Sequence, residues 1–448
     1  MREIFSPRAR QQRYLDVEGA LALVEADLGI IPRAAAEKIA ATARVEQLDA
    51  DRIAAGVDVT GHFMVPLVAE LSRVVGEPDG GWVHWGATTQ NIQQSGDVVG
   101  IRAAVRLLIL QLCDLLEGLA TLGDRGADAV MAGRTHWQQA VPITFGFKVA
   151  TWSDVMLRHL ERIEQLQPRL FTSMTGGAVG NFASLGEAGP AVQEGVARRL
   201  GLVPMAVPAR NIVDQFAELV LLLGMTAATA ASIAEEISRL MAVEFGEVSE
   251  SLPAGDVGSS TMPQKRNAKK CGETVIKAAQ VRALASLALE AMMQSHEVDG
   301  TRSAMMDHAV EQACILGSEV LSALSGVIGG LLLYPERMKS NLALSGGLIN
   351  AEAVMMKLAR TIGRQVAHEV VHQAAYLTAT GGQGARFFDA LSADPRVTSA
   401  LKPEELLQLL DPTRYVGLSA SIAREASARA RAAAVKGRTA LGVPDACR

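Results

Sequence analysis

The stretch Leu219-Val-Leu-Leu-Leu-Gly-Met-Thr-Ala-Ala-Thr-Ala-Ala-Ser-Ile-Ala234 contains no charged side chain. A helix that is apolar on every side must be covered on every side. At about 1.5 Å per residue, the stretch is shorter than the roughly 30 Å hydrocarbon core of a bilayer. It therefore predicts a buried helix at the centre of a helical bundle or of an oligomer, and no membrane partner.

Helical spacing of apolar residues continues on both sides of this stretch. Ile101, Val105, Leu108 and Leu112 lie on one face of a helix predicted from 98 to about 122. The same spacing predicts further long helices at 140–168, 212–246, 268–295 and 308–333. Aromatic residues make up only 4% of the chain, whereas good helix formers are abundant. The sequence predicts an all-α fold with a central bundle of five long helices.

The length of 448 residues allows about three domains. In the expected N-terminal helical domain, 1–97, a helix from 14 to 29 ends at a glycine, and the polar run 88–91 is predicted to form a loop. The long-helix bundle occupies 98–345. A smaller C-terminal helical domain, 346–448, is expected to contain an exposed helix at 420–434.

Composition and charge exclude several classes of protein. The net charge is -5 and Lys and Arg are not concentrated in any tract, which argues against a nucleic-acid or membrane-surface partner. The four cysteines lie far apart without a CxxC pair, so neither a disulfide framework nor a zinc site is predicted. We expect no metal and no organic cofactor. The first residues lack the apolar block of a secretion signal, which favours the cytoplasm.

The most unusual segment is Gly258-Ser259-Ser260-Thr261-Met262-Pro263-Gln264-Lys265-Arg266-Asn267. It combines hydroxyls, an amine, a guanidinium and an amide between two predicted helices. One interpretation is a solvated interhelical loop. The other is a mobile lid that brings anion-binding groups over a carboxylate.

This segment resembles the GSSxMPxKxN signature of the fumarase/aspartase superfamily, which includes class II fumarase, aspartase, adenylosuccinate lyase and argininosuccinate lyase. The block from Gly133 to Gly146 is similar to the superfamily's GRTHxQxAxPxTFG segment, and His84 to Asn91 is similar to its HxGxTSxD element. The segments 12–18 and 337–342 resemble its cycloisomerase and adenylosuccinate lyase branches. The likeness covers nearly the whole chain.

The resemblance implies a homotetramer whose long helices form a common core and whose active sites each draw on three subunits. It implies that Ser259 is the general base and that Lys265 and Asn267 hold the substrate carboxylate. It places His136 on the leaving-group side. Further substrate-binding residues implied by the motifs are Thr88, Thr89, Gln90, Thr135, Gln138, Ser260 and Met262. Weaker candidates are His62, His84, His296, Arg13, Tyr14 and Arg302.

The chemistry explains why such residue types are needed. Removing a proton beside a carboxylate creates an enediolate-like dianion, which fixed donors and a cation must stabilise. A serine hydroxyl is a weak base in water and must be ionised in a closed, dry site. A departing group needs a proton, and histidine titrates near neutral pH, where a general acid is most effective.

The chain also departs from its relatives. Asn91 replaces the Asp of the third block, and Ala268 replaces the Pro that follows the signature. Where the purine and muconate branches carry Arg-Asp-Arg this chain has Val213-Asp214-Gln215, and Val298 replaces the arginine of their His-Glu-Arg element. Missing cations disfavour a phosphate-bearing substrate such as adenylosuccinate and weaken the case for a 3-carboxymuconate enzyme.

The expected partner is a small dicarboxylate or tricarboxylate. The expected activity is proton abstraction beside a carboxylate with elimination or addition of a C–O or C–N group, similar to a 3-carboxy-cis,cis-muconate cycloisomerase. Alternatives are another succinate lyase that releases fumarate and a non-catalytic structural tetramer. A hydrolase that uses Ser259 with His136 is disfavoured, because the chain lacks the GxSxG context.

Overall fold

The computed structural model describes the chain except for residues 252–254, 256–258, 383–385 and 443–448. Helices account for 71% of it, and three two-stranded sheets are the only sheets among the described residues. The all-α prediction is confirmed. The chain divides into two compact units. Unit 1 comprises Met1–Gln111, His159–Ala228 and Lys277–Val320, and unit 2 comprises Leu112–Arg158, Thr229–Ile276 and Leu321–Arg448.

The five predicted long helices are present. They are α5 (Thr89–Arg125), α6 (Phe145–Leu170), α8 (Asp214–Leu240), α9 (Lys269–Ala291) and α10 (Gly300–Gly329). Each of these helices has one part of its length in unit 1 and the other part in unit 2. Two boundaries were predicted wrongly. The polar run 88–91 enters the first turn of α5 instead of forming a loop, and 140–144 belongs to a strand because β-branched residues and Pro142 favour extended backbone there.

The central apolar stretch lies inside α8. By length and composition alone, α8 and α10 are each long and apolar enough to cross a membrane. The length argument from the sequence was therefore wrong, since the helix extends beyond its uncharged part. Within the structure, 67% of the most apolar window of α8 is buried against protein. The prediction that the chain has no membrane partner is therefore supported by the burial of α8 against protein and not by the length of its apolar stretch.

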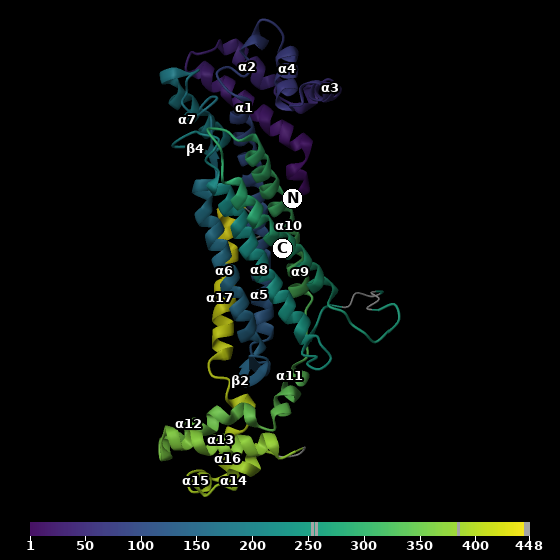
Figure 1. Ribbon diagram of the computed structural model, residues 1–448, viewed down its shortest axis with the longest axis vertical. Helices are drawn as coiled ribbons and strands as arrows, with labels where there is room; N and C mark the ends of the chain where they lie inside the picture. The colour runs from purple at the N-terminus through teal and green to yellow at the C-terminus, as the bar shows by residue number, and fades with distance from the viewer. Residues whose placement is uncertain (252–254, 256–258, 383–385, 443–448) are drawn as a thin grey trace. The chain divides into compact units, whose positions relative to one another are not determined.

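The N-terminal helices of unit 1 pack around α1 (Figure 1). The elements of unit 1 outside the long helices are η1 (Arg2–Phe5), α1 (Pro7–Asp27), α2 (Arg33–Thr42), η2 (Val45–Gln47), α3 (Ala50–Thr60), α4 (Met64–Val75), η3 (Asp79–Trp82), β3 (Thr172–Ser173), η4 (Gly186–Ala188), α7 (Gly189–Leu200) and β4 (Val203–Pro204). Ser6 caps α1 by accepting a hydrogen bond from the backbone amide of Ala9. The apolar face of α1 is buried against α2 and α7.

Unit 2 holds an antiparallel hairpin and most of the C-terminal helices. Its elements outside the long helices are β1 (Val130–Thr135), β2 (Gln138–Thr144), β5 (Val248–Ser249), β6 (Leu332–Leu333), α11 (Pro335–Leu342), η5 (Ala343–Ser345), η6 (Leu348–Asn350), α12 (Ala351–Ile362), α13 (Arg364–Thr380), α14 (Phe387–Ser392), α15 (Pro395–Thr398), α16 (Pro403–Leu409), η7 (Pro412–Arg414) and α17 (Ser419–Ala440). Helices α12 to α16 share a hydrophobic core of their own. The division into three domains and the homotetramer stay predictions.

Candidate active site

A tight hairpin turn presents His136. Strands β1 and β2 pair through Thr135 and Gln138, so His136 and Trp137 are the two turn residues. Their φ angles are 48° and 68°. Positive φ at both positions is the hallmark of a type I′ turn, which normally selects Asn-Gly. Because a bulky residue in this region is strained, the turn accepts a cost of order 1 kcal/mol or more to hold an imidazole and an indole in solvent.

A buried ion pair locks the hairpin next to its turn. Arg134 donates two hydrogen bonds to Glu247, at 3.0 and 2.6 Å, and the Glu247 side chain is 0% exposed. The Asn341 amide donates to the same carboxylate at 2.8 Å. A β-bulge at Gly133 redirects the strand, and a Cβ there would meet the Val141 carbonyl oxygen at 2.8 Å. These contacts fix the direction from which His136 projects.

A pocket of ≈ 240 Å³ opens beside His136. It is lined by Arg134, His136, Trp137, Lys148, Glu236, Arg239, Leu240 and Phe245. The Lys148 ammonium pairs with Glu236 at 2.6 Å, and the Arg239 guanidinium lies over the Trp137 ring, 5.2 Å from its centroid. Arg239 also pairs with Glu235 at 2.9 Å, so each arginine and lysine of the lining has a carboxylate partner and the pocket presents paired charges and an aromatic face next to the imidazole.

The signature segment also belongs to unit 2, and it stands away from the helices of that unit (Figure 1). The Ser259 hydroxyl accepts hydrogen bonds from the backbone amides of Thr261, at 3.4 Å, and Met262, at 3.1 Å. Gly258 lies outside the described residues. Residues 260–267 are exposed. The predicted base is thus held in a local turn whose amides already point at its oxygen, and such donors favour an alkoxide.

The C-terminal end of the segment is anchored by Glu250. Its buried carboxylate accepts from the backbone amides of Lys270, at 3.2 Å, and Cys271, at 2.7 Å. A carboxylate at these positions satisfies free amides in the first turn of α9 and complements the helix dipole.

The third block forms the N-terminus of α5 in unit 1. The Asn91 side-chain oxygen accepts from the amides of Thr88 and Gly177, each at 3.1 Å, while its amide nitrogen donates to the Gly177 carbonyl at 3.3 Å. A carboxylate has no proton to donate to that carbonyl. The departure from Asp therefore has a structural use. Thr88, Thr89 and Gln90 are half-buried at a helix N-terminus, where a carboxylate ligand is favoured.

His84 lies just before this terminus and also has a left-handed backbone, with φ of 64°. Its Nδ1 is 2.6 Å from an oxygen of Glu18, a residue that is 2% exposed. Burial lowers the pKa of His84, but the hydrogen bond and charge of Glu18 outweigh it and raise the pKa above its ordinary value. Glu18 therefore favours the protonated form of this side chain, which precedes the predicted carboxylate-binding residues in the chain.

The remaining weaker candidates are engaged within the fold. Arg13 donates to the carbonyls of Gly96 and Ile4, and the Tyr14 hydroxyl donates to Asp97. Burial raises the pKa of Tyr14. Arg302 pairs with Glu290. The His62 ring accepts from the Met64 amide, and the His296 carbonyl accepts from Asn211. Their predicted roles toward a substrate stay predictions.

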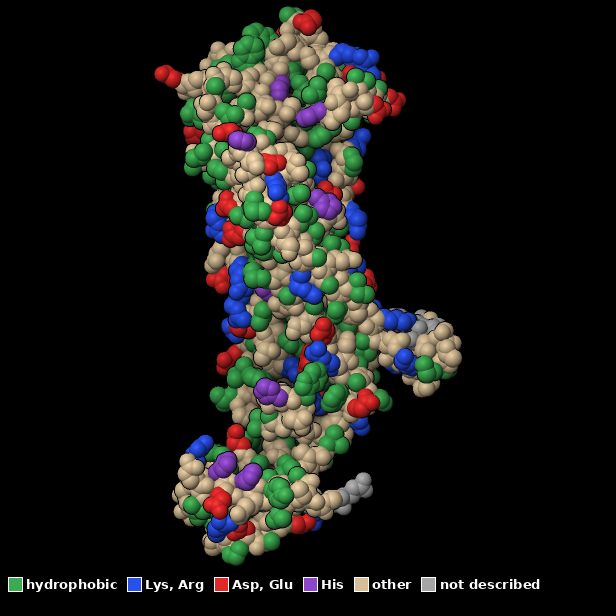
Figure 2. All heavy atoms as spheres, in the orientation of Figure 1, with side chains coloured by type: hydrophobic (Ala, Val, Ile, Leu, Met, Phe, Trp, Pro, Cys, Tyr) green, Lys and Arg blue, Asp and Glu red, His purple; other side chains and the backbone are tan. Residues whose placement is uncertain are grey.

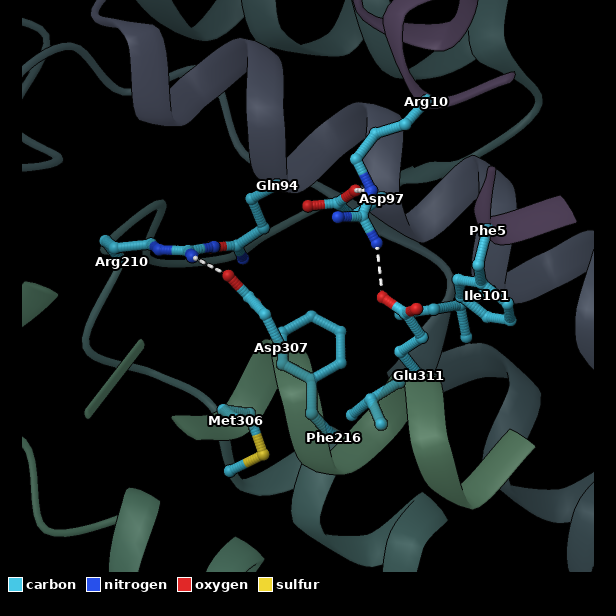
Figure 3. A pocket seen from close by; sticks show the side chains of 11 residues that line it. Phe5, Arg10, Gln94, Asp97, Ile101, Arg210, Phe216, Met306, Asp307 and Glu311 are labelled. Atoms are coloured by element: carbon cyan, nitrogen blue, oxygen red, sulfur yellow. Dashed lines mark hydrogen bonds and ion pairs between the residues drawn. The ribbon is translucent and has the colours of Figure 1, made fainter. Parts of the chain in front are cut away.

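Unit 1 contains a charged pocket that sequence reasoning missed. Arg210 donates to Gln94 at 2.9 Å and pairs with Asp307 at 3.3 Å, and Figure 3 shows its guanidinium directed into the pocket opposite Arg10. Arg10 pairs with Glu311 at 2.8 Å. Burial, reinforced by Asp307, raises the pKa of Asp97 to about 6. The pocket has a volume of ≈ 30 Å³, which is room for about one water molecule. The charged side chains around it are therefore packed against one another as a polar network.

Arg210 supplies a positive charge close in sequence to Val213 and Gln215, which stand where related branches carry arginines. It lies three residues before Val213, in the turn that precedes α8, and contacts Gln94, which lies one turn after Gln90 in α5. The position of a lone arginine outside the expected motif carried no signal in the sequence. Lys148, Arg239 and Glu247 were missed for the same reason, since only the fold brings them beside the hairpin.

Known protein families, individual proteins and solved structures match this chain over most of its length. A family model described as lyase matches residues 1–283, and one described as adenylosuccinate lyase C-terminus matches residues 347–426. The chain is 38% identical to 3-carboxy-cis,cis-muconate cycloisomerase of Pseudomonas aeruginosa, covering 93% of this chain and 91% of that protein. It is 36% identical to trans-aconitate decarboxylase 1 of Mycosarcoma maydis, covering 93% and 84%. The crystal structure of a fumarate lyase from Mesorhizobium sp. BNC1 matches with a TM-score of 0.88 at 34% identity, covering 95% of this chain and 97% of that one.

Proposed function

Because the chain belongs to the lyase family of the fumarase/aspartase superfamily, we propose that it acts on a substituted succinate, from which it removes the proton beside a carboxylate and expels a C–O or C–N leaving group. The superfamily resemblance and the enzyme class are confirmed by the comparisons. The observation that carries the proposal is the strained hairpin turn that holds His136 beside a pocket lined by ion-paired side chains and an indole.

Ser259 is the proposed base. The two backbone amides at its oxygen stabilise the alkoxide, and Lys265 supplies positive charge six residues further along the same segment. The alkoxide takes the β-proton, and the electron pair moves into the carbon framework as an enediolate. Lys265, Asn267 and the donors at 88–90 hold that dianion.

His136 is the proposed acid. The bond between the substrate carbon and the leaving oxygen or nitrogen breaks as the enediolate collapses to a double bond, and the imidazolium gives its proton to the departing atom. In the reverse direction the same groups add the nucleophile across the double bond. Lactone formation by a cycloisomerase is this addition with the substrate's own carboxylate as nucleophile, and 3-carboxy-cis,cis-muconate is therefore the first substrate to assay.

We further propose that the active unit is a homotetramer with shared sites in the cytoplasm. Large apolar side chains remain exposed on the long helices of the single chain, including Met225 at 47%, Ile276 at 63% and Leu289 at 50%. Contact with other subunits removes such surface from water. Sedimentation or light scattering measures the assembly directly, and a stable folded monomer contradicts it.

The deciding experiment follows proton exchange and turnover separately. A panel of substituted succinates is incubated with the enzyme while the absorbance of the unsaturated product is recorded. Ser259→Ala is expected to lower exchange of the substrate's β-proton with solvent by several orders of magnitude, since it removes the base. Ser260→Ala is the matched control, because it deletes the neighbouring hydroxyl and is expected to raise KM mainly. Normal exchange in Ser259→Ala shows that another residue is the base.

His136→Asn tests the acid. Asparagine tolerates the left-handed backbone, so folding should be preserved. Turnover should fall much more for substrates with poor leaving groups than for those with good ones, because only the former need a proton in the transition state. Equal losses place His136 in binding or positioning instead.

The alternatives are separated by the same measurements. A non-catalytic tetramer shows neither exchange nor turnover with any substrate. A lyase that releases fumarate from a phosphate-bearing substrate is disfavoured by the neutral residues at 213, 215 and 298, and it predicts that inorganic phosphate competes with substrate.

A further inference from the structure

Helix α13 carries two histidines at the spacing that metal ions select. The sequence His368-Glu369-Val370-Val371-His372 lies in the middle of the helix, and an i, i+4 spacing places both imidazoles on one face. Both residues are exposed. Their ring centroids are 6.2 Å apart and their planes differ by 3°. Figure 2 shows exposed histidine side chains over the C-terminal helices of unit 2.

The surroundings distinguish this pair from the zinc centre of a peptidase. In such a centre a third ligand completes the site and the intervening glutamate acts as a base. Here Glu369 lies 3.8 Å from Arg396, which also pairs with Asp394 at 2.7 Å. Among the described residues, no group of three or more His, Cys, Asp or Glu side chains is placed to hold a metal ion. The pair therefore offers two protein ligands and leaves the other positions open.

We propose that His368 and His372 form a binding site for a borderline divalent transition ion such as Cu²⁺, Ni²⁺ or Zn²⁺. Neutral imidazole nitrogens suit these ions, whereas Mg²⁺ and Ca²⁺ require oxygen ligands. Metal–nitrogen bonds of about 2.0–2.1 Å need the two rings to turn toward a common point. Exposed side chains on adjacent turns reach this arrangement by rotation about χ1 and χ2 without moving the backbone. Water completes the coordination.

The charge of the neighbourhood permits a bound cation. Arg364 lies one turn before His368 on the same face of α13, where its flexible side chain can turn toward solvent. The Arg396 guanidinium is held by Glu369 and Gln373 of α13 and by Asp394, which precedes α15. The expected order of affinity follows the ligand chemistry, with Cu²⁺ bound more tightly than Ni²⁺ or Zn²⁺. The site is separate from the proposed catalysis, so loading it should leave turnover unchanged.

The test is calorimetric titration of the full chain, freed of metal by a chelator, with Ni²⁺ at pH 7.5. We expect one ion per chain, and at least a 10-fold weaker affinity in His368→Ala and in His372→Ala. The matched control exchanges two neighbours, His372→Gln with Gln373→His. It keeps composition, charge and histidine count but moves one imidazole about 100° around the helix, so it should lose the same affinity. His308→Ala should bind as the wild type does.

Affinity should also fall on acidification, because protonated imidazoles cannot bind a metal. Cu²⁺ should broaden the NMR signals of these two rings before those of the other histidines. Equal Ni²⁺ affinity in the exchanged variant and the wild type overturns the proposal, as does binding that survives either alanine substitution. Neither result depends on turnover.

Discussion

Replacing Arg134 by methionine removes the cation that holds Glu247 and keeps most of the apolar stem. The carboxylate is 0% exposed and would retain the Asn341 amide as a donor. Breaking a buried ion pair on one side costs about 3–5 kcal/mol, because the remaining charge stays buried and uncompensated. Since 16% of the Arg134 side chain is exposed, we expect the lower end, about 3 kcal/mol.

The same change should impair catalysis. The hairpin keeps two residues at positive φ, and the ion pair lies one residue from its tip. When the anchor is lost, the turn can relax and His136 loses its direction. We expect kcat to fall at least 10-fold for substrates with poor leaving groups, whereas binding of the carboxylates should change less.

The assay is urea unfolding at a fixed protein concentration, because subunit association contributes to stability. Arg424→Met is the matched control, since Arg424 and Asp128 form an exposed pair in the same unit, worth at most about 1 kcal/mol. The double variant Arg134→Met with Glu247→Gln should recover part of the loss. A cost below about 1 kcal/mol for Arg134→Met, or normal kcat in a destabilised protein, refutes the reasoning.

Three further measurements test other parts of the structure. Trp137→Gly should be more stable than Trp137→Val by about 2 kcal/mol in thermal unfolding, because only glycine adopts φ of 68° without strain; equal stabilities contradict the turn assignment. Burial, reinforced by Glu18, raises the pKa of Glu25 to about 8, so Glu25 stays protonated in the folded chain while it ionises in the unfolded one. The unfolding free energy should therefore fall by about 1.4 kcal/mol per pH unit between pH 5 and 8, and Glu25→Gln should remove that slope; an unchanged slope contradicts it. The pKa of His84 is raised, so its pairing with Glu18 stabilises the fold fully below about pH 6.5, and this stabilisation is lost as the pH rises through the folded-state pKa. In an NMR titration, the His84 midpoint should lie above 6.5 and should drop in Glu18→Gln. A midpoint that does not change in Glu18→Gln refutes the pairing.

The long helices could be predicted because their signal is local. Apolar residues recur with a period near 3.6 through α5 and α6, while α8 is marked by its long uncharged stretch, and neither signal needs knowledge of distant contacts. The boundary at 140–145 was mistaken since Val141 and Phe145 have the i, i+4 spacing of a helical face, while Val141 and Ile143 alternate as in a strand. Only pairing with β1 decides between them.

The residues of the candidate site also fall into a group that could be predicted from the sequence and a group that could not. Residues inside a contiguous motif, such as Ser259 and His136, could be named from the sequence. Residues that support them could not, because Arg134 and Glu247 are 113 positions apart and Asn91 is 86 positions from Gly177. Nothing local in the chain marks Glu247 as the partner of an arginine. The pair His368 and His372 has a local signal, the i, i+4 spacing, which a prediction from cysteine spacing does not include.

The left-handed backbone at His84 and His136 sets selection for folding against selection for chemistry. At φ of 64° and 48°, asparagine and glycine fold at lower cost than most residues, and β-branched residues fold at the highest. In a library randomised at position 136 and sorted by cellular abundance, asparagine and glycine should therefore rise above histidine. Sorted by growth on the substrate, the same library should return histidine. Positions at which the two rankings disagree identify side chains that the lineage has retained for turnover at the expense of stability.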